Sequence, residues 1–435
     1  MLTSPDFSLD TYEVSARNGF LPSDSPLQCL PNAYYAPWED VARDLTASIS
    51  EGTIREAIDS LPVLSTSKLQ TEPEWRRAYV VLAYFTHAYV WGGETPKDTL
   101  PPAISVPFLK VSKHLELPPC ATYAALNLWN WSTTSPNADL TCTDNLNVTL
   151  SFTGTKDEEW FFMISVAMEA RGAQIIQLIL HTIQAASVGD NGRIVAYLNQ
   201  IADGFQELAR ILERMYEKNR PAVFFHQLRP YLAGSKNMAS AGLPSGLFYD
   251  IGQGKGEWHQ YSGGSNAQSS LIQTFDIFLG VDHSALGSPT KAELPKAMPQ
   301  GKTPYIHEMR NYMPGPHRRF LEMLTRNANL RDYAMSSPLG SAVRDAYNAA
   351  VMSLGSFRDK HIQIVTRYII MAAKMPRPEG TPNRLNLASS TQTHLKDKDS
   401  NEKLSNGISG TGGTDLIPFL KKTRDDTKAA ANYAD

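Results

Sequence analysis

The feature that most limits the fold is one stretch that is apolar on nearly every side of a helix, WFFMISVAMEARGAQIIQLILHTI (Trp160–Ile183). Polar side chains interrupt this stretch at Glu169, Arg171, Gln174 and Gln177, which a membrane span rarely tolerates. A helix that is apolar all round needs neighbours on every side, so we expect it at the centre of a helical bundle.

Other segments repeat their apolar residues with the helical period, and no segment shows the sustained alternation of a strand. The predicted fold class is therefore all-α. LELPPC at 115–120 breaks any helix at its proline pair, and we expect it to separate a small N-terminal domain, 1–118, from a large helical domain, 119–435. The further predicted helices are 72–90, 191–218, 266–279 and 341–375, the last ended by Pro376.

Composition excludes several classes of protein. The net charge of −3 and a pI near 6.4 give no overall attraction to nucleic acid or to an anionic membrane. The three cysteines are widely spaced, so we expect neither a disulfide framework nor a zinc cluster. The first residues lack the pattern of a secretory signal, and we expect a cytoplasmic protein that binds neither membrane nor nucleic acid.

A long polar segment, 377–413, follows the last predicted helix, and we interpret it as a lid over a binding site. The segment GTGGTD (410–415) closes it. GTGG can form a nest of backbone N–H groups for an anion, or it can be a flexible hinge.

Common catalytic motifs are absent from the sequence. It contains no HExxH, no GxSxG, no phosphate loop with GK[ST] and no GxGxxG after a strand. GQGKG (252–256) lacks the strand and helix that a phosphate loop needs. The chemistry must therefore come from another kind of site.

His361 lies on an apolar helix face with Arg358 one turn before it. A histidine in such a place is more often a hydrogen-bonded core residue than a ligand, and Asp276 could supply the anion that Arg358 needs. Haem would satisfy both side chains, with iron for the imidazole and propionates for the guanidinium. The same face or its margin carries Leu354, Phe357, Ile364, Val365 and Tyr368.

A series of motifs resembles the indoleamine 2,3-dioxygenase family. In chain order they are WFFMISVAMEA, FFHQLRPYLAG, GGSNAQSSLIQTFDIFLG, MRNYMPGPHRRFLEML, LRDYAM, FRDKHIQIVTRYI and GTGGTDL. The likeness covers most of the chain and reaches the N-terminal segment. Residues 384–408 and parts of the small domain have no clear counterpart. An ordered series of this length is specific to the family.

The resemblance implies a two-domain helical haem dioxygenase fold, with the small domain capping the large one. It implies haem b, with His361 as the only protein ligand to iron and the opposite position left for dioxygen. The implied reaction converts L-tryptophan to N-formyl-L-kynurenine, the first step of the kynurenine pathway, which can serve NAD biosynthesis. A monomer and an unidentified electron donor are also implied.

The resemblance assigns further residues by motif. Phe224 packs on the indole, Arg229 binds the substrate carboxylate and Ser165 lies over the distal haem face, so these three are the expected catalytic residues. Ser265 and Arg358 are the expected haem contacts. The remaining expected substrate contacts are Tyr123, Phe161, Phe162, Gly264 and Thr411.

Two residues depart from the vertebrate pattern. Asn266 replaces a small apolar alanine, so we expect a more polar or narrower pocket wall. Leu126 replaces a cysteine near the distal pocket, so we expect a different substrate fit and inhibitor preference. Two alternatives stay open: a non-catalytic haem protein that binds or senses dioxygen, and a paralogue that acts on another indole derivative. Arg229, Phe224 and GTGG are all present, which favours an enzyme.

Overall fold

The computed structural model describes residues 8–283, 305–379, 381 and 416–431. The long apolar stretch forms one helix, α6 (Lys156–Ser187). The Thr155 side chain caps its N-terminus by accepting the backbone N–H of Glu158 at 3.2 Å, and three acidic residues in the first turn complement the helix dipole. The predicted central helix is confirmed.

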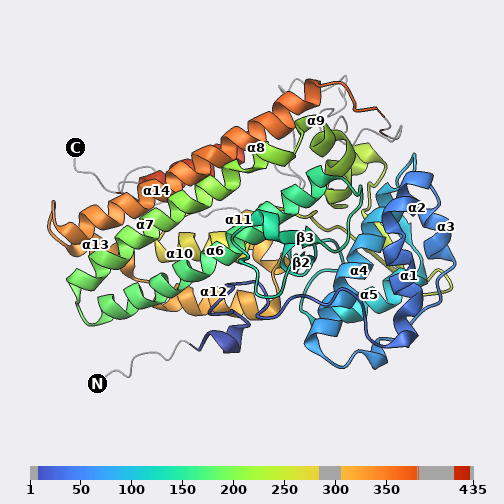
Figure 1. Ribbon diagram of the computed structural model, residues 1–435, viewed down its shortest axis with the longest axis horizontal. Coiled ribbons are helices and arrows are strands. Elements are labelled where there is room, and N and C mark those ends of the chain that lie inside the picture. Colours follow the sequence, from blue (N-terminus) through green and yellow to red (C-terminus); the bar gives the residue numbers. More distant parts are fainter. Residues whose placement is uncertain (1–7, 284–304, 380, 382–415, 432–435) are drawn as a thin grey trace, which may run out of the picture.

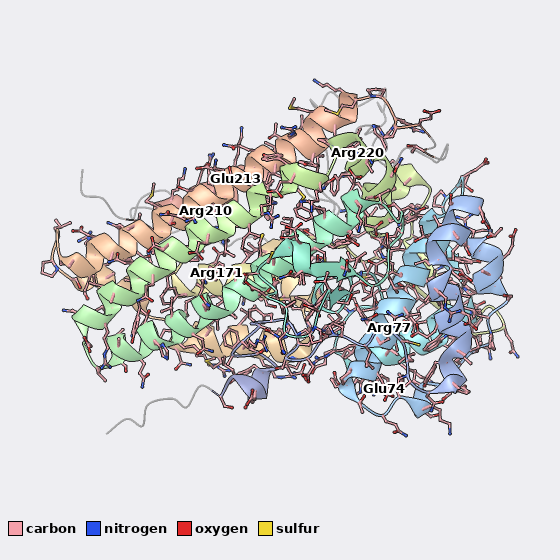
Figure 2. The ribbon with its side chains drawn as sticks, viewed as in Figure 1. Glu74, Arg77, Arg171, Arg210, Glu213 and Arg220 are labelled. Atoms are coloured by element: carbon pink, nitrogen blue, oxygen red, sulfur yellow. The ribbon has the colours of Figure 1, made fainter. Side chains whose placement is uncertain are left out.

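Two more long helices complete the elongated half of the molecule (Figure 1): α7 (Asn191–Glu213) packs along α6, and α14 (Ala342–Val365) packs along α7. Arg171 interrupts the apolar stretch because it reaches from α6 to Glu207 of α7 and closes their interface (Figure 2). The C-terminal helix α16 (Leu416–Ala429) packs on α14. The shorter helices of this half are α8 (Met215–Lys218), α9 (Pro221–Val223), α10 (Ser270–Phe278), α11 (Tyr305–Glu308), α12 (Gly315–Asn327) and α13 (Leu330–Ser336).

The first helices gather at the other end of the molecule (Figure 1). They are α1 (Ala36–Arg43), α2 (Leu45–Glu51), α3 (Ile54–Asp59), α4 (Glu72–Trp91) and α5 (Pro102–His114). A buried ion pair between Arg77 and Glu39, 2.6 Å apart, joins α4 to α1. One apolar core runs through both halves, so the proposed division at residue 118 stays a prediction.

Five short strands occur in the described ranges. β1 (Thr99–Leu100) pairs in parallel with β4 (Leu247–Asp250), and β4 pairs in antiparallel with β5 (Gly256–His259), with Thr99 opposite Phe248 and Leu247 opposite His259. β2 (Trp131–Thr133) and β3 (Leu146–Val148) form a separate antiparallel pair. These strands are minor additions, and the predicted all-α fold class is confirmed.

Three π-helical turns interrupt the helical pattern, at Ala124–Leu128, Phe224–Leu228 and Thr366–Met371. A π-helical turn holds one more residue than an α-helical turn, and such turns are frequent at functional sites. The third turn follows α14 directly, so the predicted helix 341–375 changes its winding after Val365. Short 3-10 helices complete the chain at Leu9–Tyr12, Ala33–Tyr35, Thr66–Lys68, Thr143–Asn145, Arg229–Leu232, Ala239–Ala241, Asn266–Gln268, Met309–Tyr312 and Ala372–Lys374.

Among the described helices, α6 alone is long and apolar enough to cross a membrane. In this structure 72% of its most apolar window is buried inside the protein. The apolar surface of α6 is therefore covered by the neighbouring helices, as a core helix requires.

Candidate active site

One cavity between α6 and α14 collects the residues that the sequence predicted for the site. It holds about 1820 Å³ of space between protein atoms, part of it open to solvent. Thr411 and nearly all of the predicted lid lie outside the described residues. The predicted residues that line the cavity are Tyr123, Phe161, Phe162, Ser165, Phe224, Arg229, Gly264, Ser265, Arg358 and His361.

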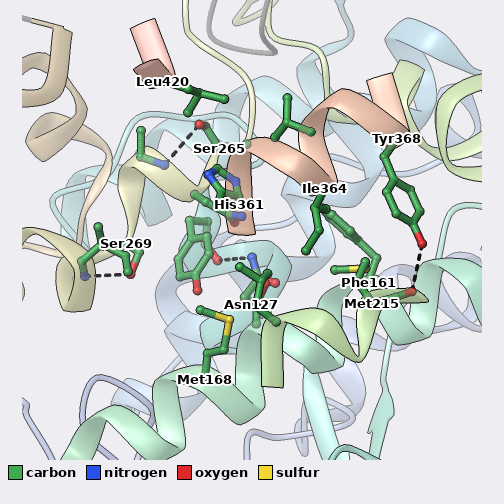
Figure 3. Close-up of a pocket in the computed structure, with 18 of the residues that line it drawn as sticks. Asn127, Phe161, Met168, Met215, Ser265, Ser269, His361, Ile364, Tyr368 and Leu420 are labelled. Atoms are coloured by element: carbon green, nitrogen blue, oxygen red, sulfur yellow. Dashed lines mark hydrogen bonds between the residues drawn. The ribbon is translucent and has the colours of Figure 1, made fainter. Parts of the chain in front are cut away.

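His361 enters this cavity from α14, and Met168 enters it from α6 on the opposite side (Figure 3). Burial, and secondarily the charge of Arg358, lowers the pKa of the imidazole to about 4. The ring is therefore neutral at pH 7, and nothing within the described ranges hydrogen-bonds to it. A neutral imidazole with a free lone pair is what a metal ligand requires.

Arg358 makes a buried ion pair with Asp276, the alternative partner expected from the sequence. Its Nη2 donates to both carboxylate oxygens of Asp276 at 2.8 Å, and its Nη1 donates to Thr427 of α16. Burial by itself raises the pKa of Asp276, but the adjacent Arg358 charge and His283 lower it overall. Arg358 still lines the cavity, and its contact with a haem propionate stays a prediction.

Aromatic rings form one wall of the cavity. The ring centroids of Phe161 and Phe224 lie 4.7 Å apart, and those of Phe161 and Phe162 lie 5.4 Å apart. Phe224 opens the second π-helical turn, whereas the other two rings come from α6. Such a wall can bury a flat aromatic ligand through offset and edge contacts.

Arg229 brings a positive charge to the same cavity. Its side chain is only 5% exposed, and its guanidinium lies 5.4 Å from the centroid of the Phe225 ring. Burial lowers the pKa of Arg229 to about 10, so the side chain remains a cation at neutral pH. A buried guanidinium beside an aromatic wall favours a ligand that carries both a ring and an anion.

The lining residues fit a haem. No three histidine, cysteine, aspartate or glutamate side chains in the described part of the chain lie close enough together to hold a metal ion. The described residues therefore do not offer three such ligands to a metal at His361, and a cofactor can supply the others. The apolar surfaces of α6 and α14 suit the two faces of a porphyrin, and Arg358 suits its acidic edge.

Comparison with known proteins decides the family. The family model for indoleamine 2,3-dioxygenase matches residues 8–430. The chain belongs to the indoleamine 2,3-dioxygenase family. Its members are haem-dependent dioxygenases. This chain is therefore a dioxygenase, and the predicted family is confirmed.

Named relatives match this dioxygenase along almost its whole length. The indoleamine 2,3-dioxygenase of Penicillium citrinum is 41% identical over 430 residues, with 98% of this chain and 89% of the relative covered. That of Saccharomyces cerevisiae is 38% identical, with 98% and 94% covered. The 6-hydroxytryptophan 2,3-dioxygenase of Fusarium equiseti is 36% identical, with 96% of each chain covered.

Leu126 packs against Gly264 in the cavity wall of this dioxygenase. A Cβ atom placed on Gly264 would lie 2.3 Å from a methyl carbon of Leu126, so the two residues fit only because position 264 has no side chain. Asn266 also lines the cavity, but it is exposed and lies at the rim. Leu126 thus fills the space beside Gly264, and Asn266 adds a polar group near the entrance. The expected effects of both residues on substrate fit stay predictions.

Glu169 and Asn127 are cavity residues of the dioxygenase that sequence reasoning missed. Glu169 Oε1 accepts hydrogen bonds from the Tyr123 hydroxyl at 2.9 Å and from Ser269 Oγ at 2.7 Å. The spacing of the sequence could have identified Glu169, because it follows Ser165 by one helical turn and lies on the same face of α6. Burial raises the pKa of Glu169 to about 7.

We expect Glu169→Gln to remove one component of the pH dependence of stability. The carboxyl has a pKa near 4.5 when unfolded and about 7 when folded, so its ionisation destabilises the dioxygenase as pH rises from 4.5 through 7. Relative to the variant, the wild type should lose about 3 kcal/mol of unfolding free energy between pH 4 and pH 8. Urea unfolding at both pH values measures this difference.

The control for this experiment is Glu51→Gln at the exposed end of α2, which should leave the pH dependence of the wild type unchanged. The wild type and both variants contain the same histidines with shifted pKa values. The contributions of these histidines to the pH dependence of stability therefore cancel when the proteins are compared. If the difference in unfolding free energy between the wild type and Glu169→Gln is the same at pH 4 and pH 8, the expected effect of Glu169 ionisation on stability is contradicted.

Proposed function

We propose that this enzyme uses haem to open the pyrrole ring of L-tryptophan with dioxygen, giving N-formyl-L-kynurenine. The single observation that carries the proposal is the meeting of a neutral histidine, an aromatic wall and a buried arginine at one cavity. The family membership and the indoleamine 2,3-dioxygenases among the relatives support it. Both oxygen atoms enter the product, so the reaction needs no further oxidant.

Each residue has a task that its position allows. His361 would hold the iron, and bound haem supplies the chemistry that activates dioxygen. Arg229 would bind the substrate carboxylate, while Phe161 and Phe224 pack on the indole and exclude water. Ser165 offers a hydroxyl on the α6 side of the cavity. We further propose a cytoplasmic monomer and an electron donor that keeps the iron ferrous.

An assay with purified components tests the proposal. Reduced, haem-loaded protein supplied with L-tryptophan and air should produce the absorbance of N-formylkynurenine, with one dioxygen consumed for each product. Mass spectrometry after reaction in ¹⁸O₂ should find two labelled oxygen atoms in the product. Haem binding without any product would favour the non-catalytic alternative instead.

A second candidate is oxidation of another indole derivative. The relative in Fusarium equiseti is named for 6-hydroxytryptophan, and the polar Asn266 at the rim makes the entrance of this cavity less apolar. Parallel assays with substituted tryptophans separate the two candidates, because the preferred substrate has the higher kcat/KM.

A further inference from the structure

Two buried side-chain oxygens of the cavity residues have no hydrogen-bond donor in the described part of the protein. They are Oδ1 of Asn127 and Oε2 of Glu169. Both side chains are held by Tyr123, whose hydroxyl donates to Glu169 at 2.9 Å and whose backbone carbonyl accepts from Asn127 Nδ2 at 3.4 Å. Buried oxygens without donors are uncommon in native proteins, so each needs an explanation.

The two oxygens differ in what they need. Glu169 can carry a proton at its free oxygen, which removes the cost of burying a charge. The amide of Asn127 is neutral at every pH and its oxygen can only accept. The orientation of this amide follows from its neighbour, because Nδ2 faces the carbonyl of Tyr123 and Oδ1 must point elsewhere.

Asn127 is a buried residue of the cavity wall. The side chain is 4% exposed and belongs to the first π-helical turn, Ala124–Leu128, directly after Leu126. In the view of Figure 3 it lies below His361, with Phe161 and Met168 around it. Phe161 and Asn127 line the same cavity, so a ring packed against Phe161 shares that cavity with the amide of Asn127.

We propose that Asn127 recognises a hydroxyl group on the six-membered ring of the indole, so that a ring-hydroxylated tryptophan binds more tightly than an analogue with a methyl group in the same place. The inference rests on the proposed function, since it places a tryptophan ring in this cavity. The hydroxyl donates to Oδ1 and supplies the donor that the amide lacks. A site built around a buried acceptor discriminates strongly against a ligand without the donor.

The experiment compares matched substrates in the haem-loaded enzyme. The substrates are L-tryptophan, its 5-hydroxy and 6-hydroxy derivatives, and its 5-methyl and 6-methyl derivatives. Methyl and hydroxyl groups have similar size. The ratio of kcat/KM for the hydroxy derivative to kcat/KM for the methyl derivative therefore reports the hydrogen bond and not a steric difference. The variant is Asn127→Leu, which keeps the side-chain shape and removes the acceptor.

The wild type should prefer the hydroxyl over the methyl derivative by roughly 10- to 100-fold at one of the two ring positions. In Asn127→Leu this ratio should fall to about one. A wild-type ratio near one at both positions would overturn the inference. So would a high ratio that survives the substitution.

A binding measurement separates this inference from the proposed function. Calorimetric titration of the haem-loaded protein gives the dissociation constants of the same derivatives whether or not they react. Tighter binding of the hydroxyl derivative, lost in Asn127→Leu, would support the role of Asn127 even if no indole is oxidised. Formation of N-formylkynurenine with equal binding of hydroxyl and methyl derivatives would support the function and reject the role.

Discussion

The His361→Ala variant should fail to bind haem stoichiometrically and should lose its dioxygenase activity. Loss of a residue that only supports a metal ligand costs about 10- to 100-fold in affinity, and loss of the sole protein ligand should cost more. Haemin titration followed by the Soret absorbance measures the affinity, and far-UV circular dichroism shows whether the helices remain.

The control for this variant is His181→Ala, which removes an exposed imidazole from α6 and should bind haem like the wild type. A second variant, His361→Gly, leaves space for free imidazole, which should restore the Soret band when added at millimolar concentration. Full haem binding and turnover in His361→Ala would exclude His361 as the ligand.

Replacing Arg229 should weaken the binding of substrates that carry a carboxylate. The side chain is buried and remains charged, so its hydrogen bonds to an anion are shielded from water. We expect Arg229→Gln to raise KM for tryptophan roughly 10- to 100-fold, since a hydrogen bond to a charged group contributes about 1.5–3 kcal/mol. Steady-state kinetics with L-tryptophan provide the measurement.

Tryptamine, which has the indole ring but no carboxylate, supplies the matched control ligand. Its dissociation constant should be nearly the same for the wild type and Arg229→Gln. An equal loss of affinity for tryptamine and tryptophan would show that the substitution distorts the cavity through the Phe225 contact and does not remove a carboxylate clamp.

Helical spacing was sufficient to place His361 and Arg358 on one face of the last long helix, because α14 keeps a regular winding up to Val365. The spacing could not choose the partner of Arg358. Asp276 lies on α10, far away in the sequence, and its approach depends on how α10 packs against α14 and α16. Family motifs located the aromatic wall and Arg229, whereas the roles of these residues stay predictions.

Asn127 shows why some site residues escape sequence reasoning. It follows Tyr123 by four residues, a spacing that places both on one face of an α-helix. The turn between them is π-helical and holds more residues than an α-helical turn. A period of 3.6 residues therefore does not predict which way the Asn127 side chain faces. Glu169 sits in a regular helix, but an acidic residue inside an apolar stretch indicates only that something polar lies nearby.

The three π-helical turns also have an evolutionary consequence. Each equals an α-helix with one inserted residue, and Leu126, Phe224 and Tyr368 all line the cavity from such turns. Because one residue rotates a helix by about 100°, losing a single codon there would exchange the residues that face the cavity. A one-codon deletion in such a turn would therefore change the side chains that line the cavity while the bundle of α6, α7 and α14 keeps its own residues.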